Sequence, residues 1–103
     1  MSYFLITYRP PRKSFPGDAT EPETAIIGEH FEFLKQLLAE RRLIIAGRRE
    51  DAELGIVVID VDSEATARSI LESDPAISGG VFSGEVAPFR LALMADRVAL
   101  DGK

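Results

Sequence analysis

The stretch GIVVIDVDSEATARSILESDP (residues 55–75) decides the fold, because it joins a strand directly to a helix. Its first seven residues are rich in β-branched side chains, which is typical of a strand. Asp62 or Ser63 then provides a helix N-cap, and apolar side chains recur on one face over residues 62–73. Pro75 ends this helix, since the residue before a proline avoids helical geometry. The stretch predicts one strand–helix unit.

Upstream of this unit, AIIGEHFEFLKQLLAERR (residues 25–42) predicts a second helix. Its apolar residues recur at helical spacing, and Glu, Lys and Gln occupy the other face. His30, the only histidine of the chain, falls inside the apolar stripe. LIIAG (residues 43–47) predicts a strand that Gly47 closes, and the charged residues 48–54 predict a turn.

Farther out, YFLITYR (residues 3–9) predicts the first strand, and the proline-rich residues 10–22 predict a long surface loop. ISGGVFSGEVAPF (residues 77–89) predicts a fourth strand, bulged at its glycines, in which Pro88 marks an edge position or a strand end. The C-terminal tail, residues 91–103, is expected to form a short helix or to pack on a neighbour.

The resulting βαββαβ order is a split βαβ pattern, and we expect residues 1–103 to form a single domain. Two helices cover only one face of a four-stranded sheet. Yet residues 3–8 and 55–61 are apolar at odd and even positions, which indicates strands buried on both faces. We expect a second copy of the sheet to cover the second face, giving a homodimer. The alternative is that the C-terminal tail folds back over this second face of the sheet.

The composition of the 103 residues is that of an ordinary globular chain. The net charge of −5 argues against nucleic acid as a partner, because phosphate binding needs a basic surface. The absence of cysteine excludes disulfides and thiol nucleophiles. Because no signal-peptide core or membrane-spanning run is found, we expect a cytoplasmic protein with no membrane partner.

A possible acid–base pair joins the two predicted helices. Asp74 prolongs the apolar stripe of the second helix, and both helices are expected to pack on the same face of the sheet. His30 and Asp74 could therefore approach each other, and each would relieve the cost of burying the other. An imidazole held by a carboxylate is a common general acid–base arrangement. The alternatives are a histidine that is simply satisfied in the core and an aspartate that caps a turn.

Candidate substrate-binding residues lie at the ends of two predicted strands: Arg9 is the last residue of the first, Gly47 is the last residue of the second, and Arg48 follows it. The arginines would suit an anionic group, although a solvated loop or turn is the alternative for each. A single histidine and scattered carboxylates form no metal-binding spacing, and the glycines of residues 78–84 lack the context of a phosphate loop. We therefore expect no cofactor.

The segments GEHFEFLKQLLAERRLIIAG (residues 28–47) and GIVVIDVDSEATARSILESDPAISGGVFSGEVAPF (residues 55–89) together resemble the YCII-related family. In order, the resemblance rests on His30, Ile44–Gly47, Asp74-Pro75 and Pro88-Phe89. It implies a ferredoxin-like α+β domain whose four-stranded antiparallel sheet pairs into a dimeric α/β barrel. It also implies an active site built around a histidine and an aspartate, here His30 and Asp74.

The function expected from this sequence is cofactor-free acid–base chemistry on a small organic molecule. His30 would accept or donate the proton and Asp74 would orient its ring, in an isomerisation, a proton abstraction or an HX elimination. A non-catalytic dimer that binds a ligand, with the pair as a buried hydrogen bond only, is the second hypothesis. A cofactor-free monooxygenase is a third.

Overall fold

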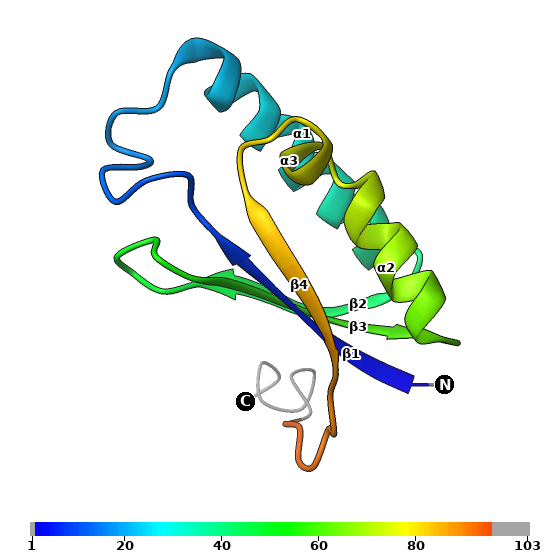
Figure 1. The fold of residues 1–103 in the computed structure, drawn as a ribbon. Helices are drawn as coiled ribbons and strands as arrows, with labels where there is room; N and C mark the ends of the chain where they lie inside the picture. Colours follow the sequence, from blue (N-terminus) through cyan, green and yellow to red (C-terminus); the bar gives the residue numbers. More distant parts are fainter. Residues whose placement is uncertain (1, 96–103) are drawn as a thin grey trace, which may run out of the picture.

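The computed structural model describes residues 2–95, which form one sheet with a layer of helices on one face (Figure 1). The elements, in order, are β1 (Ser2–Arg9), α1 (Glu21–Ala39), β2 (Leu43–Arg48), β3 (Gly55–Val61), α2 (Glu64–Ser73), α3 (Pro75–Ser78) and β4 (Ser83–Pro88). The strands lie in the order β2-β3-β1-β4, and every neighbouring pair is antiparallel. The predicted ferredoxin-like α+β class is confirmed. The pairing of two sheets into a barrel stays a prediction.

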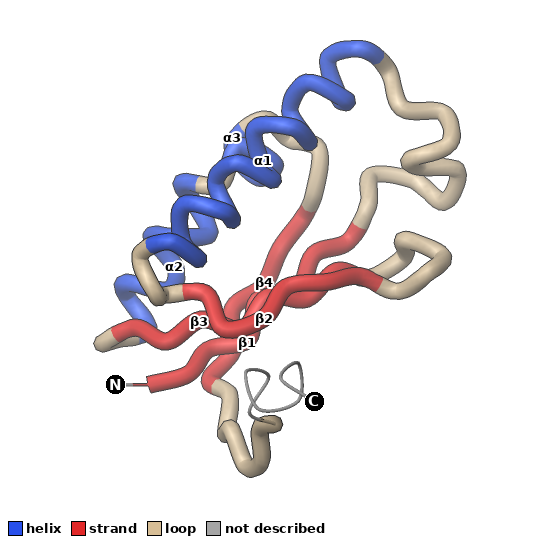
Figure 2. Tube along the Cα trace, turned by 180° about the vertical axis from the view of Figure 1, so that it is seen from behind, coloured by secondary structure: helices blue, strands red, loops and turns tan. Residues whose placement is uncertain are grey.

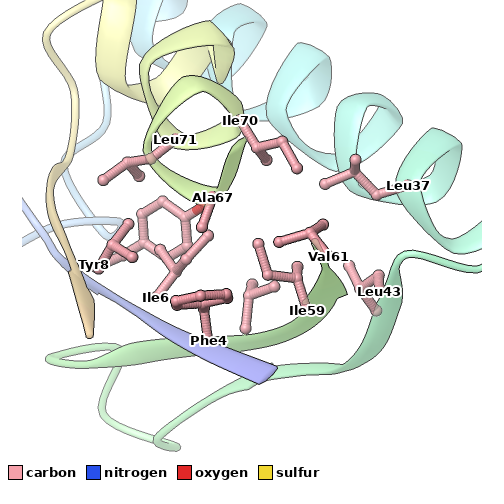
Figure 3. Packing of buried hydrophobic residues seen from close by; sticks show 12 residues of the cluster. Phe4, Ile6, Tyr8, Leu37, Leu43, Ile59, Val61, Ala67, Ile70 and Leu71 are labelled. Atoms are coloured by element: carbon pink, nitrogen blue, oxygen red, sulfur yellow. The ribbon is translucent and has the colours of Figure 1, made fainter. Parts of the chain in front are cut away.

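The core lies between the sheet and α2, with α1 alongside. Phe4, Ile6 and Tyr8 alternate along β1 toward the helices, and each is at most 5% exposed. They pack with Ile59 of β3 and with side chains of both long helices, as Figure 3 shows for the core around α2. The central strand β1 thereby carries a continuous buried row, whose last member, Tyr8, ends in a polar hydroxyl group.

The opposite face of the sheet carries a second apolar row. Leu5 of β1 lies directly across from Val58 of β3, which lies across from Ile45 of β2. Ile45 is 56% exposed, although it is a large aliphatic side chain in a strand. The described helices all lie on the other side of the sheet (Figure 2). This open face is where the sequence predicts a second copy to bind.

The first helix, α1, begins and ends earlier than the predicted residues 25–42. It begins at Glu21 because Thr20 and Glu23 form a capping box: the Thr20 hydroxyl accepts from the Glu23 amide, and the Glu23 carboxylate accepts from the Thr20 amide. It ends at Ala39, and Arg41 then adopts a left-handed conformation with φ of 62°. That reversal turns the chain into β2 and leaves the two arginines outside the helix.

The segment after Asp74 also differs from the prediction. Pro75 ends α2 but begins a further short helix, α3, because proline is well suited to a first helical position. The fourth strand therefore starts only at Ser83, and the predicted bulge is not in it: the irregular register lies in β2, between Leu43 and Ile45. Pro88 is the last residue of the edge strand β4, as expected.

The loop from Pro10 to Thr20 is organised around Arg12, although the sequence predicted only a surface loop. The Arg12 guanidinium donates to Asp18 at 3.0 Å and to Glu23 of α1 at 2.7 and 2.9 Å. These hydrogen bonds hold the pKa of Asp18 and Glu23 below their usual range. Phe15, at the centre of the loop, is only 6% exposed. The loop is thus tied to α1 and inserts an aromatic ring into the protein.

Candidate active site

Asp74 lies at the junction of α2 and α3 and belongs to both. It is the C-cap of α2 and the N-cap of α3, and its Oδ1 accepts a hydrogen bond of 2.9 Å from the Ala76 amide. The side chain is 0% exposed, the one buried charged residue among residues 2–95. A carboxylate in this position needs further donors, because an unpaired buried charge is costly.

His30 supplies one of these donors from the middle of α1. Its Nδ1 lies 2.8 Å from Asp74 Oδ1 and 2.9 Å from Oδ2. The His30 side chain is 12% exposed, so the ring is mostly buried but reaches the surface of a cavity. The structure thus brings together the two side chains that the sequence had paired. Asp74 also caps α3, so the turn-capping alternative describes the same residue without excluding the pairing.

Tyr8 is a site residue that was not predicted from the sequence. Its hydroxyl donates to Asp74 Oδ2 at 2.8 Å, across a separation of 66 residues. Burial, together with the charge of Asp74 and this hydrogen bond, raises the pKa of the Tyr8 phenol, so the hydroxyl stays protonated and remains a donor. The available signal was the alternation of β1, which places Tyr8 on the helix-facing side after Phe4 and Ile6.

Aromatic rings hold the imidazole of His30 on two sides. The Tyr8 ring lies 5.2 Å from it, centroid to centroid, at 75°. The Phe82 ring lies 5.5 Å away at 88°, and Phe15 of the long loop packs against Phe82 at 5.9 Å. These edge-to-face contacts fix the plane of the His30 ring. Phe15 and Phe82 had not been predicted as site residues.

A cavity of about 430 Å³ opens beside His30, a volume within the range of small-molecule sites. It lies between α1, the long loop and the β2–β3 hairpin, which meet at one end of the molecule (Figure 2). Its walls are mainly apolar and aromatic, and they include Phe15, Ile27, Phe31, Leu34, Ile56 and Phe82. Polar side chains among the described lining residues are few: His30 of α1, Tyr8 of β1 and Arg48 of β2.

The predicted substrate-binding residues fall in two places. Gly47 and Arg48 line the cavity, and β2 continues through Arg48, one residue beyond its predicted end. The Arg48 guanidinium donates only to the backbone carbonyls of Arg49 and Glu50, at 3.3 and 3.4 Å, among its contacts within residues 2–95. Arg9 is exposed and alternates with Tyr8 to the opposite face of the sheet, and it is not among the described residues that line the cavity.

The hydrogen bonds around Asp74 assign the proton on His30. Tyr8 and Ala76 both donate to the carboxylate, which therefore acts as an acceptor, and Nδ1 of His30 must then carry the hydrogen that it shares with Asp74. In the neutral ring, Nε2 holds the free lone pair and is the nitrogen left to meet a ligand. This is the form of histidine that accepts a proton. Within residues 2–95 no three His, Asp or Glu side chains are grouped to hold a metal ion.

The chain belongs to the YCII-related family, because the model of the YCII-related domain matches residues 1–90. It is also 41% identical over 54 residues to the uncharacterized protein YjpA of Bacillus subtilis (strain 168), a match that covers 52% of this chain and 64% of YjpA. The match thus spans a little under two thirds of that relative.

Three solved structures share the fold. A 5-chloro-2-hydroxyhydroquinone dehydrochlorinase (TftG) from Burkholderia phenoliruptrix AC1100, in complex with 2,5-dihydroxybenzoquinone, has a TM-score of 0.68 and 18% identity, over 87% of this chain and 95% of that one. A muconolactone isomerase has a TM-score of 0.68 and 17% identity, over 91% and 94%. Protein Atu4242 of Agrobacterium tumefaciens has a TM-score of 0.54 and 16% identity, over 93% and 98%. At these identities the likeness establishes the fold alone.

Among residues 2–95, no helix has the length and apolar character needed to cross a membrane.

Proposed function

We propose that this protein is an enzyme that moves a proton on a small organic molecule, with His30 as the general base and Asp74 as the residue that orients it. The hydrogen bond from His30 Nδ1 to a fully buried carboxylate carries the proposal, because it leaves Nε2 free beside a ligand-sized cavity. No cofactor is required for this chemistry.

The reaction begins when Nε2 takes a proton from a carbon made acidic by a neighbouring carbonyl group. The resulting imidazolium is stabilised by Asp74. The proton then returns to a different carbon, which is an isomerisation, or a halide leaves with its bonding electrons, which is an HX elimination. Both outcomes balance without an oxidant or reductant. The dehydrochlorinase and isomerase names of two structural neighbours support this pair of outcomes.

The substrate that suits the cavity is a compact ring compound with one anionic group. Phe15, Phe31 and Phe82 provide aromatic walls, which favour a flat apolar body. Arg48 is the lining residue that carries a formal positive charge, and we propose that it binds the anionic group with Gly47 allowing close approach. Arg9, on the other face, would serve this role only for a site formed with a second copy.

Deuterium exchange tests the proposed chemistry without knowledge of the product. The protein is incubated in D₂O with muconolactone, 5-chloro-2-hydroxyhydroquinone and a panel of small cyclic carbon acids, and loss of C–H signals is followed by NMR together with chloride release. We expect catalysed exchange in the wild type and a loss of roughly 100-fold or more in His30→Gln. Glu29→Gln, an exposed change in the same helix, is the matched control. Equal exchange in wild type and His30→Gln would exclude His30 as the base, and tight binding without exchange would favour the ligand-binding hypothesis.

We further propose that two copies pair through the open face of the sheet, and that the protein works in the cytoplasm. Exposed Ile45 on that face supports the pairing. The matched control is Leu38 of α1, which is also 56% exposed but lies on the helical layer. Sedimentation should show a dimer that Ile45→Lys dissociates and Leu38→Lys leaves intact. A wild-type monomer, or equal effects of both changes, would contradict the pairing.

A further inference from the structure

Tyr8 is buried and engaged with Asp74, yet acid–base chemistry by His30 and Asp74 does not itself require it. The ring is 4% exposed, and its hydroxyl lies 2.8 Å from Asp74 Oδ2. Packing of the aromatic ring does not by itself account for the hydroxyl group, whose partner is the buried Asp74 carboxylate.

We propose that Tyr8 is a positioning residue that sets the proton affinity of the His30–Asp74 pair, by sharing the Asp74 carboxylate with His30. The inference rests on the proposed role of His30 as the base. It adds a third member, from the central strand, to a pair that otherwise comes from the helices.

The geometry divides the carboxylate among three donors. Oδ1 accepts from the Ala76 amide at 2.9 Å, Oδ2 accepts from the Tyr8 hydroxyl at 2.8 Å, and His30 Nδ1 lies within 2.9 Å of both oxygens. Each donor stabilises the negative charge, so each reduces the strength with which the carboxylate draws a second proton onto the histidine ring. Removing the Tyr8 donor should make the pair a stronger base.

The same contacts position the imidazole. The planes of the Tyr8 and His30 rings meet edge to face at 75°, while the Tyr8 hydroxyl donates to Asp74. One residue therefore contacts both members of the pair. Tyr8 itself is held in β1 between two glycines, Gly55 of β3 and Gly84 of β4, which lie directly across from it. A Cβ atom at Gly55 would touch the Tyr8 side chain at an ordinary contact distance of 3.6 Å, whereas one at Gly84 would lie 2.9 Å from Leu71 of α2.

Few other charged groups face His30. Among residues 2–95, its titratable contacts are Asp74, at the junction of α2 and α3, and Tyr8 of β1. Phe82, from the segment before β4, contacts the His30 ring, and Phe15 of the long loop packs against Phe82; both are uncharged. Arg48 of β2 lines the same cavity, and its charge is unaltered by changes at Tyr8. A change in proton uptake on removing the Tyr8 hydroxyl is therefore attributable to Asp74.

The test uses the fact that His30 is the only histidine, so its Cε1 proton gives an unambiguous NMR signal. The pH midpoint of proton uptake by the pair is measured in the wild type and in Tyr8→Phe, with no substrate required. We expect a rise of about 0.5 to 1 pH unit in Tyr8→Phe, since a hydrogen bond to a charged group has been lost. Tyr3→Phe, which removes the other tyrosine hydroxyl, should leave the midpoint unchanged.

A control variant separates the effect of the Tyr8 hydrogen bond on the proton affinity of the pair from a general disturbance of ring packing. Phe82→Leu alters the ring packing around His30 but removes no hydrogen bond. An unchanged midpoint in Tyr8→Phe, or an equal rise in Phe82→Leu, would overturn the proposal. Neither result would bear on whether His30 catalyses exchange, so the two proposals fail separately.

A second measurement applies if Tyr8→Phe does not fold. In Tyr3→Phe, Tyr8 is the single remaining tyrosine, so its ionisation is followed directly by ultraviolet absorbance. The Tyr8 hydroxyl lies 2.8 Å from Asp74 Oδ2, and burial together with the charge of Asp74 raises the pKa of Tyr8. Asp74→Asn in this background should therefore lower the pH at which Tyr8 ionises. Ionisation at the same pH with and without the Asp74 charge would overturn the coupling.

Discussion

Two clusters of hydrogen-bonded carboxylates in this protein differ chiefly in burial. The Asp74 cluster consists of Asp74, His30, Tyr8 and the Ala76 amide, and the Asp74 side chain is 0% exposed. The Arg12 cluster consists of Arg12, Asp18 and Glu23, whose side chains are 35%, 48% and 18% exposed.

The hydrogen bonds are of similar length in both clusters, so distance does not distinguish them. A group released from the Arg12 cluster regains water, whereas a group released from the Asp74 cluster has no other partner. We infer that the buried cluster contributes more to stability than the exposed cluster, which holds the long loop against α1. Four experiments test or refine this contrast.

The largest effect is expected from Asp74→Ala. The change leaves the Tyr8 hydroxyl, the His30 Nδ1–H and the Ala76 amide without an acceptor and removes the N-cap of α3. We expect the free energy of unfolding to fall by about 3 to 5 kcal/mol, measured by urea denaturation. Asp74→Asn keeps one acceptor and the shape, and should lose roughly 1 to 3 kcal/mol. If Asp74→Ala lowered the free energy of unfolding no more than Asp51→Ala, a change at an exposed aspartate, the contrast between the buried and exposed clusters would not hold.

The next effect is expected at Gly79, which follows α3. A Cβ atom there would lie 2.7 Å from the Pro75 carbonyl oxygen, so α3 would have to move and would disturb the backbone around Asp74. We expect Gly79→Ala to destabilise the protein by about 1 to 3 kcal/mol. Gly28→Ala in α1 is the control: nothing lies within 4 Å of the new atom, and alanine should stabilise the helix by about 1 kcal/mol. Effects of the same sign at both sites would contradict this account.

A smaller effect is expected from Arg12→Met, which removes the hydrogen bonds to Asp18 and Glu23 and keeps much of the side chain's length. The melting temperature should fall far less than in Asp74→Ala, because both carboxylates remain hydrated. The His30 signal in NMR should keep its chemical shift. A drop comparable to that of Asp74→Ala would show that the loop, and the insertion of Phe15, matter as much as the buried cluster.

The smallest effect is the acid dependence of that same loop. Arg12 lowers the pKa of Glu23 from 4.5 to about 2, so the stabilisation is present above pH 4.5 and is lost as the pH falls toward 2. The difference in unfolding free energy between wild type and Arg12→Met should therefore shrink across this window. Both proteins contain Asp74, so its own response cancels in the difference. A difference that is constant with pH would show that Glu23 does not depend on Arg12.

The local elements were predictable because their signals are local. The spacing of apolar residues located both long helices and all four strands. The N-cap of α2 was predicted to be Asp62 or Ser63, and the structure has Ser63 there. The predicted helix boundaries were less accurate where a proline or a capping box determines where a helix begins. Pro75 both ends α2 and begins α3, and the Thr20–Glu23 capping box starts α1 earlier than its apolar stripe suggests.

The candidate site was predictable in part, for a similar reason. His30 and Asp74 stood out because each is a polar residue at a position where its helix is otherwise apolar. Tyr8 did not stand out, because a tyrosine suits a buried strand and its hydroxyl reveals no partner in the sequence. Phe15 also gave no signal, since it lies in a proline-rich loop that has no periodicity.

By itself, then, the sequence determined the order of helices and strands, the buried stripe of each, and the two polar residues within the stripes, because these depend on neighbours a few positions apart. Only the tertiary structure decided that Tyr8 donates to Asp74 across 66 residues, that Phe82 packs on the histidine ring with Phe15 behind it, and that Arg48 lines the cavity while Arg9 does not. Those arrangements depend on the register of strands and the packing of helices, which bring together residues that no local pattern connects.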